Sequence, residues 1–173
     1  MFDLREYKES DAELILSWIA DEKSFRQWSA DKYKSYPASA QDVNDFYGQI
    51  KANGARAFMF YDDGKAIGHF VMRPLVDETV KTVRMGFIII DAFVRGMGYG
   101  KAMLKEALRF AFEKLRAERV TLGVFENNPK AQRCYESVGF KAFSETVYDI
   151  CGEEWKCIEM ECDGIKCLSE QLT

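Results

Sequence analysis

The chain has 173 residues, of which 47% are hydrophobic and 30% charged, a balance typical of a globular domain with a sizeable core. Its formal net charge of -4 argues against a general nucleic-acid binder. No apolar run approaches the about 18 residues of a membrane helix, and Met1–Glu6 lacks the apolar core of a secretory signal. We therefore expect one cytoplasmic domain over residues 1–173, ending in a tail at 163–173, without nucleic-acid or membrane partners.

The cysteines do not indicate a disulfide framework or a metal site. There are five of them, an odd number, and no two form a CxxC pair. The four nearest the C-terminus are Cys151, Cys157, Cys162 and Cys167, and their spacing differs from the usual zinc patterns. A domain of this size with its own core has little need of disulfides. We expect reduced thiols and no bound metal.

The N-terminal region predicts a strand and a helix. Apolar and polar residues alternate through Phe2–Tyr7, which predicts a strand. Ser10, followed three residues later by Glu13, fits a capping box at the start of a helix. The buried side of this helix is expected to consist of Leu14, Ile15, Trp18 and Ile19. The following segment, 25–36, is rich in aromatic residues and has no regular period.

A second helix and a hairpin come next. The helix is predicted to begin near Ser39 or Ala40 and to end at Asn53-Gly54, which can supply left-handed backbone. Its buried residues are expected to be Val43, Phe46, Tyr47 and Ile50. Two strands, Ala57–Tyr61 and Ala66–Met72, flank an Asp-Asp-Gly-Lys turn, which is typical of a β-hairpin.

The central region predicts a buried strand, a glycine-rich connection and a long helix. Pro74 and Asp77-Glu78 predict a turn before the strand Val80–Asp91. The connection is Arg95–Lys101, with three alternating glycines. The apolar positions of the helix recur at three- and four-residue spacing, namely Leu104, Ala107, Leu108, Ala111 and Leu115.

The C-terminal region predicts three strands and one helix. A short strand, Val120–Phe125, is followed by Asn128-Pro129, which suits the cap and first residue of a helix that Gly139 ends. The last strands are Ala142–Cys151 and Glu154–Cys162. The whole order, β-α-α-β-β-β-α-β-α-β-β, predicts an α/β (α+β) fold. Its sheet is mixed and mostly antiparallel, with a central β-α-β piece whose strands are parallel.

The Arg95–Lys101 segment is a candidate anion site. Glycines let the backbone approach a ligand closely, and the helix start behind them presents unpaired N–H groups and the positive end of the dipole. A Walker loop is excluded, because only three residues separate Gly96 from Gly100 and Ala102 replaces the required hydroxyl. A Rossmann fingerprint counted from Gly96 needs glycine where Lys101 stands. An ordinary glycine-rich turn is the alternative.

What remains, Arg95-x-x-Gly98-x-Gly100, resembles the acyl-CoA loop of the GNAT acetyltransferases (Gcn5-related N-acetyltransferases). The block from Asn128 to Phe140 is similar to the family's Asn-x-x-Ala-x-x-x-Tyr…Gly-Phe motif, and the order of elements also matches. In that family the loop amides hold the pyrophosphate of coenzyme A, so the resemblance implies acetyl-CoA as cosubstrate. The cofactor-binding residues that it implies are Phe87, Ile88, Ile89, Ile90, Arg95, Gly96, Met97, Gly98, Tyr99, Gly100, Lys101, Asn128, Ala131 and Tyr135.

Tyr135 is the candidate general acid, because the resemblance puts it near the sulfur of the cofactor. A neutral tyrosine with a pKa of about 10 can protonate a thiolate leaving group whose pKa is about 8.5. The alternative is a half-buried tyrosine that packs a helix. By family analogy, a backbone N–H near Ile88–Ile90, where the strand separates from its neighbour, would bind the oxyanion.

The general base is less clearly marked. Many relatives carry a glutamate two residues before the glycine of this strand, but Arg84 stands there, before Gly86. Glu126 is the best remaining carboxylate, acting directly or through water, and its alternative is a solvated acid at a strand end. His69, the single histidine, lies on a predicted strand and is expected to be structural.

Trp28 and Tyr33 are the candidate acceptor-binding residues, although aromatic residues of this segment can equally close the core. The resemblance implies an acetyl-CoA-dependent N-acetyltransferase, working as a monomer or homodimer. The acceptor would be a primary amine (protein N-terminus, lysine or small amine) that attacks directly in a ternary complex. Two alternatives are a non-catalytic CoA-binding sensor or interaction module, and a nucleotide-binding domain in which Glu126 contacts a ribose.

Overall fold

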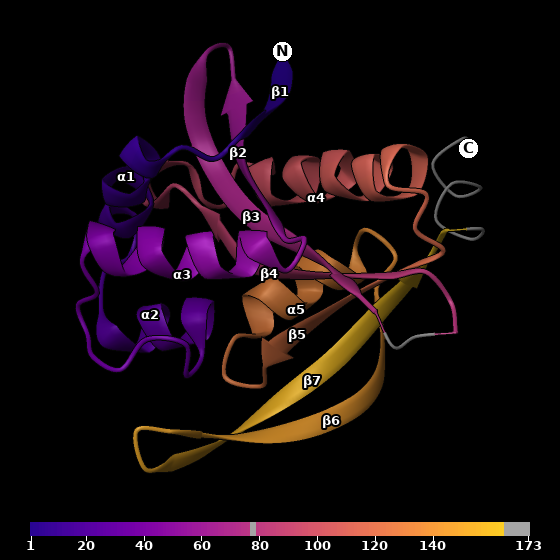
Figure 1. The fold of residues 1–173 in the computed structure, drawn as a ribbon. Coiled ribbons are helices and arrows are strands. Elements are labelled where there is room, and N and C mark those ends of the chain that lie inside the picture. The colour runs from indigo at the N-terminus through magenta and orange to yellow at the C-terminus, as the bar shows by residue number, and fades with distance from the viewer. Residues whose placement is uncertain (77–78, 165–173) are drawn as a thin grey trace. The chain divides into compact units, whose positions relative to one another are not determined.

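The computed structural model describes residues 1–76 and 79–164 (Figure 1). Within these residues seven strands form one sheet in the order β1-β2-β3-β4-β5-β7-β6. β4 and β5 pair in parallel, whereas β1–β2, β2–β3, β5–β7 and β6–β7 pair antiparallel. The predicted mixed, mostly antiparallel α/β fold with a central parallel pair is therefore confirmed. The turn expected at 77–78, and the tail from residue 165 onward, lie outside the described residues.

The bounds of the elements agree closely with the predicted ones, except in the N-terminal region. The strands are β1 (Phe2–Glu6), β2 (Arg56–Asp62), β3 (Lys65–Leu75), β4 (Thr82–Ile90), β5 (Arg119–Phe125), β6 (Lys141–Ile150) and β7 (Glu153–Asp163). The helices are α1 (Ala12–Ser17), α2 (Glu22–Ser29), α3 (Ala40–Ala52), α4 (Tyr99–Arg109) and α5 (Pro129–Glu136). Short 3-10 turns, η1 (Glu9–Asp11) and η2 (Ala92–Val94), precede α1 and follow β4, and a π-helical segment, η3 (Phe110–Lys114), extends α4.

The chain divides into two compact units, each made of two segments. Unit 1 comprises Met1–Arg73 with Gly86–Gly100, and unit 2 comprises Pro74–Met85 with Lys101–Thr173. The boundaries fall within β3, within β4 and in the first turn of α4. The single domain over residues 1–173 stays a prediction.

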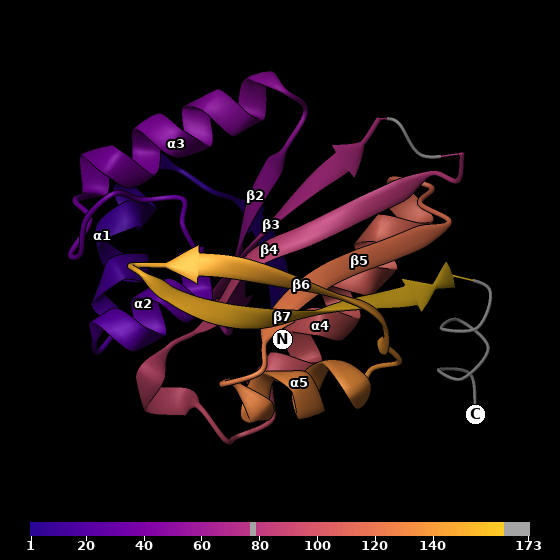
Figure 2. The ribbon, with the colours of Figure 1, turned by 90° about the horizontal axis from the view of Figure 1, so that it is seen from below.

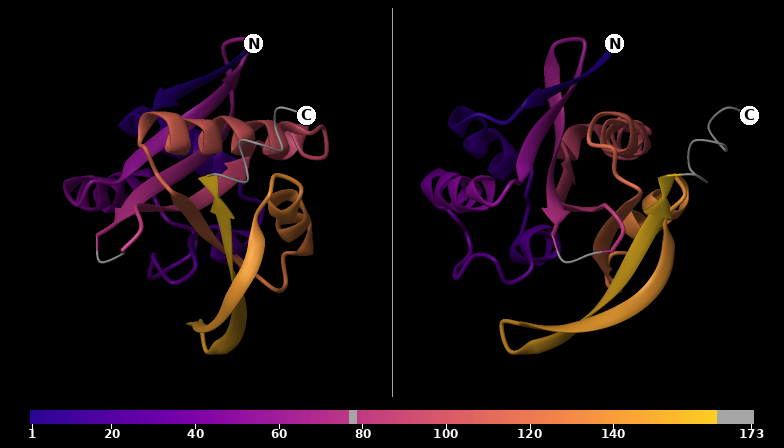
Figure 3. Two further views of the ribbon diagram at one scale, coloured as in Figure 1. Left: turned by 90° about the vertical axis from the view of Figure 1, so that its right-hand side faces the viewer. Right: turned by 45° about the vertical axis from the view of Figure 1, so that its right-hand side comes forward.

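In unit 1, α1, α2 and α3 lie on one face of the strands β1–β3 (Figures 1 and 3). The core between them is formed by apolar residues from every one of these helices and from β2, β3 and β4. Its buried members are Ala12, Ile15, Trp18, Phe25, Trp28, Tyr33, Ala38, Val43, Tyr47, Ala55, Met59, Val71 and Ile89. The predicted buried side of α3 faces this core: Val43 and Tyr47 are buried, and Phe46 and Ile50 are partly buried.

The predicted capping box of Ser10 and Glu13 is wrong. A 3-10 turn comes first, so that α1 begins only at Ala12. A one-way cap lies two residues earlier, where the Lys8 backbone N–H donates to the Asp11 carboxylate at 2.7 Å. An aspartate can make this short reach as well as a glutamate can, and the sequence pattern did not distinguish the two positions.

The helix α2 extends into the aromatic segment 25–36 that was predicted to be irregular. Asp21 begins it, because its carboxylate accepts the backbone N–H of Ser24 at 2.7 Å. Phe25 and Trp28 lie three residues apart on this helix and both are buried. The prediction for α1 also erred in one position, since Leu14 is 40% exposed.

The predictions for α3 and the hairpin are confirmed. Ser39 caps α3 and accepts the backbone N–H of Asp42 at 3.1 Å. The β2–β3 turn has left-handed backbone at Asp63 (φ 45°) and Gly64 (φ 81°), as the turn signal requires. Pro74 was expected to mark a turn but lies inside β3, next to its last residue. A proline is tolerated there because the end of a strand does not need its missing N–H.

His69 is a buried core residue with both ring nitrogens engaged. Its Nδ1 lies 2.9 Å from the Phe58 carbonyl oxygen, and its Nε2 lies 2.7 Å from the Tyr47 hydroxyl. Because burial penalises the charged ring, the pKa of His69 is lowered from 6.5 to about 3. The structural role predicted for this histidine agrees with the geometry.

In unit 2, β6 and β7 form a long curved hairpin, which Figure 2 shows beside β5. One side of these strands is apolar and buried, with Val120, Leu122 and Val124 on β5 and Met160 and Cys162 on β7. The other side carries ion pairs between strands. Arg84 on β4 pairs with Glu159 at 2.7 Å, and Arg119 on β5 pairs with Glu161 at 3.1 Å, both carboxylates being on β7.

The described residues contain neither a helix that could span a membrane nor a cluster of side chains that could hold a metal ion. Among residues 1–76 and 79–164, every helix is too short or too polar to cross a bilayer. In the same part of the chain, no three His, Cys, Asp or Glu side chains gather in a way that could hold a metal ion.

The buried neutral His69 predicts a specific dependence of stability on pH. As the pH falls below 6.5, the unfolded chain gains a proton on this ring, whereas the folded chain does not until about pH 3. The free energy of unfolding should therefore fall with the pH across this window, by at most about 1.4 kcal/mol per pH unit from this group. Urea unfolding of the wild type and of His69→Gln, between about pH 7 and about pH 5, measures the effect. The wild type should show the steeper slope, and parallel slopes would contradict the assignment.

Candidate functional site

The glycine connection of unit 1 has the backbone of an anion site. Gly96 (φ 80°) and Gly98 (φ 88°) are both left-handed, and α4 begins directly after them at Tyr99. A Cβ atom added at either glycine would meet no heavy atom within 4 Å. The backbone therefore requires glycine at both positions because of the positive φ angles, and not because a side chain would lack space. An open loop at a helix start, with N–H groups that α4 leaves unpaired, suits a phosphate group.

Arg95 fixes the beginning of this loop. Its Nε donates to the Ile90 carbonyl oxygen at 3.0 Å, and its Nη2 donates to the Trp18 carbonyl oxygen at 2.8 Å. The side chain thereby ties the loop to the end of β4 and to the residue that follows α1. Arg95, predicted to bind the cofactor, holds the loop through these two carbonyl groups in this structure.

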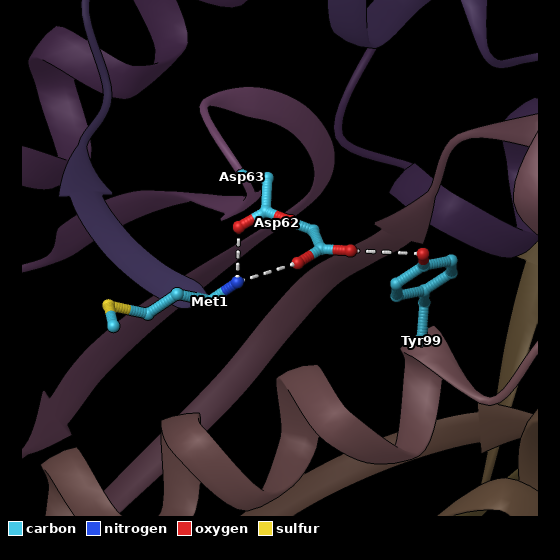
Figure 4. Close-up of polar contacts among 4 residues, drawn as sticks. All are labelled: Met1, Asp62, Asp63 and Tyr99. Carbon is cyan, nitrogen blue, oxygen red and sulfur yellow. Dashed lines mark hydrogen bonds and ion pairs between the residues drawn. The ribbon is translucent and has the colours of Figure 1, made fainter.

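The β2–β3 turn holds the other end of the loop. Figure 4 shows the Tyr99 hydroxyl directed at the Asp62 carboxylate, to which it donates at 3.0 Å. This carboxylate raises the pKa of Tyr99. The same carboxylate accepts from the Met1 ammonium at 3.2 Å, and Asp63 accepts from it at 2.5 Å. Tyr99, the first residue of α4, is therefore anchored to the hairpin turn.

A second contact joins the same turn to the residue that follows β4. Asp91 is 5% exposed and accepts the backbone N–H of Phe93 at 3.0 Å. The ammonium of Lys65 lies 3.8 Å from its carboxylate, and the Asp91 N–H donates to the Ile67 carbonyl oxygen at 2.9 Å. The β2–β3 hairpin thus contacts the chain on both sides of the glycine loop.

The strand before the loop departs from regular geometry at Phe87. Its φ of 51° is in the left-handed region, which a residue with a large side chain rarely adopts. The described ladder between β4 and β5 joins Thr82–Arg84 to Arg119–Thr121 and goes no further along β4. The predicted separation of the strand from its neighbour near Ile88–Ile90 agrees with this register.

In unit 2, α5 carries the second predicted motif. Asn128 caps the helix, and its Oδ1 accepts the Ala131 backbone N–H at 3.3 Å. Tyr135 is 7% exposed and packs edge-on against Phe140, with ring centroids 6.2 Å apart. Burial raises the pKa of Tyr135, so its hydroxyl stays protonated throughout the neutral range. Asn128, Ala131 and Tyr135 thus lie along one short helix, as the motif predicts.

Lys101 belongs to the same surroundings within unit 2. Burial raises the pKa of the Cys134 thiol, and the positive charge of Lys101 opposes that rise. The ammonium of Lys101 therefore acts on the residue next to Tyr135. The sequence had given no indication of this link between the start of α4 and α5.

Arg84 has a buried partner that the sequence reasoning missed. Its Nη1 and Nη2 donate to the two carboxylate oxygens of Glu159, at 2.7 and 3.3 Å. Thr146 also donates to this carboxylate, at 3.2 Å. The pair packs over Gly123, where an added Cβ would lie 2.9 Å from Arg84 and 2.7 Å from Cys157. A half-buried arginine in the middle of a strand needs a hydrogen-bond acceptor, so the sequence could have indicated that Arg84 has an acidic partner.

Glu126, the candidate base, lies at the surface. Its side chain is 64% exposed, and its carboxylate lies 3.9 Å from the ammonium of Lys156. The same ammonium lies 3.7 Å from Glu145. The arrangement fits a solvated acid and also leaves the carboxylate open to water.

Trp28 and Tyr33, the candidate acceptor residues, are both buried. Their rings are nearly parallel, with an interplanar angle of 7° and centroids 6.0 Å apart. Within the described residues, neither Trp28 Nε1 nor the Tyr33 hydroxyl has a hydrogen-bond partner. Burial raises the pKa of Tyr33. Trp28 also contacts Phe87 edge-on at 5.3 Å, so unit 1 brings one predicted acceptor residue and one predicted cofactor residue together.

These features define a class of protein with a mixed α/β fold. A strand, an open glycine loop and a helix start form a candidate anion site, and one strand later comes an asparagine-capped helix with a buried tyrosine. The chain belongs to the Acetyltransferase (GNAT) family, whose model matches residues 21–140. This range includes both predicted motifs.

Curated relatives and solved structures agree with this membership. The "Probable spermine N(1)-acetyltransferase" of Bacillus subtilis subsp. natto (strain BEST195) is 34% identical over 85 residues, 47% of this chain and 56% of that protein. The chain thus spans about half the length of this relative. The "Spermidine N(1)-acetyltransferase" of Vibrio cholerae is 24% identical over 138 residues, 79% of this chain and 77% of that protein. A crystal structure of the spermidine N-acetyltransferase from Vibrio cholerae, in complex with CoA and spermine, superposes with a TM-score of 0.80. At 23% identity over 96% of this chain and 98% of that chain, it shows the shared fold.

The left-handed glycine of the loop provides a test of the anion site. Gly98→Ala should weaken the binding of acetyl-CoA about tenfold, because an alanine at φ 88° costs about 1–2 kcal/mol and shifts the loop amides. Isothermal titration calorimetry measures the Kd.

The matched control is Gly152→Ala, in the β6–β7 turn. It has a similar φ of 84° and equally open surroundings. Both variants should lose stability, but only Gly98→Ala should lose affinity. Equal Kd values for the two variants would contradict an anion site at the loop.

Proposed function

We propose that the protein is an acetyl-CoA-dependent N-acetyltransferase that transfers the acetyl group to a primary amine. The observation that carries this proposal is the open loop of Gly96 and Gly98 at the start of α4, in a chain of the GNAT family. The backbone amides of residues 96–101 would hold the pyrophosphate of coenzyme A. The β4 residues Phe87–Ile90 and the α5 residues Asn128 and Ala131 would contact the rest of the cosubstrate.

The reaction has a simple balance of bonds and protons. The amine nitrogen attacks the thioester carbonyl carbon, the C–N bond forms, and the C–S bond breaks to release the thiolate. A backbone N–H of Ile88–Ile90 would stabilise the oxyanion. Tyr135 would protonate the thiolate, because burial keeps its hydroxyl protonated.

The acceptor must lose one proton before or during attack. Relatives' usual glutamate is replaced by Arg84, whose guanidinium is bound to Glu159. Glu126, open to solvent, would take the proton directly or through a water molecule.

We propose a small amine as the acceptor. The names of the relatives support this class, since several of them are spermine or spermidine N-acetyltransferases. Trp28 and Tyr33 would contribute to its binding through their aromatic rings, which attract ammonium groups. Polyamines are therefore the first acceptors to test.

Release of free CoA thiol is the direct test of the activity. Acetyl-CoA should stabilise the protein and raise its Tm. The protein should also release thiol with at least one of spermidine, spermine, a lysine peptide or an aminoglycoside. Binding without thiol release across this panel would favour a non-catalytic CoA-binding module. The absence of any Tm shift at millimolar acetyl-CoA would refute both.

Tyr135→Phe tests the general acid. Removal of the hydroxyl should lower kcat by about 10²-fold and leave the Kd of acetyl-CoA nearly unchanged, because the ring still packs on Phe140. Stopped-flow thiol detection and calorimetry measure the two quantities. An unchanged kcat would mean that Tyr135 only packs α5.

Glu126→Gln tests the general base. The rate should fall about tenfold near pH 7 but little near pH 9, because a higher pH deprotonates more of the amine without help. The control is Glu145→Gln, whose carboxylate pairs with the same Lys156 and is similarly exposed, at 61% against 64%. Equal pH–rate profiles for the two variants would exclude Glu126 as the base.

A further inference from the structure

We propose that Tyr47 and His69 are positioning residues: they hold Phe87 in its left-handed conformation and so direct the β4 amides that receive the thioester oxygen. This inference rests on the proposed function for the role of those amides. Its structural basis lies entirely within unit 1.

The conformation of Phe87 needs support from its surroundings. A phenylalanine at φ 51° lies in a sparsely populated region of backbone space, where a side chain crowds the backbone. Such a residue persists only where neighbouring structure holds it, and it turns its two flanking peptide groups out of the alternation of a regular strand. The amides of Ile88–Ile90 follow directly, so their direction depends on this residue.

Three aromatic rings surround the Phe87 side chain. Trp28 meets it edge-on at 5.3 Å, Tyr47 meets it edge-on at 5.7 Å, and Phe46 lies tilted at 5.4 Å. Edge-to-face pairs at these distances are favourable and directional. The ring of Phe87 is therefore held from α2 and from α3.

Of these three rings, Tyr47 is fixed by a polar network of known direction. A carbonyl oxygen can only accept, so the Nδ1 of His69 carries the proton that it donates to Phe58. The ring is neutral because burial lowers the pKa of His69 to about 3, and its Nε2 is therefore an acceptor. The Tyr47 hydroxyl consequently donates to Nε2 at 2.7 Å. The two rings also stack, with centroids 5.5 Å apart and an angle of 19°.

This network connects β2 and β3 to β4 through α3. Phe58 lies on β2, His69 on β3, Tyr47 on α3 and Phe87 on β4. Each step is a hydrogen bond or a ring contact between buried or half-buried groups. Removing one hydroxyl from Tyr47 cuts the polar link while keeping the ring that fills the core.

The matched control is Tyr7→Phe. Tyr7 belongs to the same aromatic group, with ring centroids 4.9 Å from Tyr47 and 5.9 Å from His69, and its hydroxyl donates to Asn44. In the described part of the chain, the ring contacts of Phe87 involve Trp28, Phe46 and Tyr47, and not Tyr7. Both variants thus remove one hydrogen-bonded hydroxyl from one cluster, and only Tyr47→Phe reaches Phe87.

Two measurements test the inference. Tyr47→Phe should lower kcat about tenfold, with the Kd of acetyl-CoA within about twofold of the wild type, whereas Tyr7→Phe should leave both within about twofold. The infrared carbonyl frequency of bound ¹³C-labelled acetyl-CoA should also move toward its value in water in Tyr47→Phe and not in Tyr7→Phe. Phe87→Ala, which removes the held ring, should move the carbonyl frequency in the same direction as Tyr47→Phe does.

The outcomes separate this inference from the proposed function. Equal kcat values in Tyr47→Phe and Tyr7→Phe, or an unchanged carbonyl frequency in Tyr47→Phe, would overturn the positioning role. A wild-type protein that binds acetyl-CoA but releases no thiol would refute the proposed transfer, while the infrared measurement would still report on the amides.

Discussion

An anion site made of backbone amides has to be held open by bonds that do not involve the anion. Gly96 and Gly98 supply the left-handed backbone, but glycine also leaves the unfolded loop unusually free. The structure counters this freedom from outside the loop. Arg95 binds two carbonyl groups at its start, and Asp62 binds Tyr99 at its end. The preorganised loop then depends on the β2–β3 turn as much as on its own sequence.

The strand that leads into the loop is shaped by a related constraint. The N-terminal part of β4 pairs with β5, whereas Phe87 and Ile89 pack in the core of unit 1. Phe87 marks the change, since its left-handed backbone interrupts the strand while its ring stays in the core. Phe87 therefore both packs in the apolar core and sets the direction of the β4 backbone. A reactive backbone site can be built in this way without any charged side chain.

Much of this arrangement could be predicted from the sequence. The strands, the parallel β4–β5 pair, the cap at Asn128 and the position of the glycine loop follow from local patterns, because periodicity and capping act over a few residues. The helix α2 was missed because its aromatic residues obscured the period. Contacts between distant segments left no local pattern. Nothing near Tyr47 in the sequence indicates His69, and nothing near Arg84 indicates Glu159.

The pairing of Arg84 with Glu159 constrains how this chain can change. A glutamate at position 84, as many relatives are expected to have, would face the Glu159 carboxylate beside Gly123, with no cation between them. Two adjacent buried carboxylates repel each other, so one would have to bind a proton or the strands would have to move. Replacing Arg84 by glutamate is therefore costly while Glu159 keeps its charge. A glutamate base at position 84 would need Glu159 to be replaced as well, because Arg84 now neutralises that carboxylate.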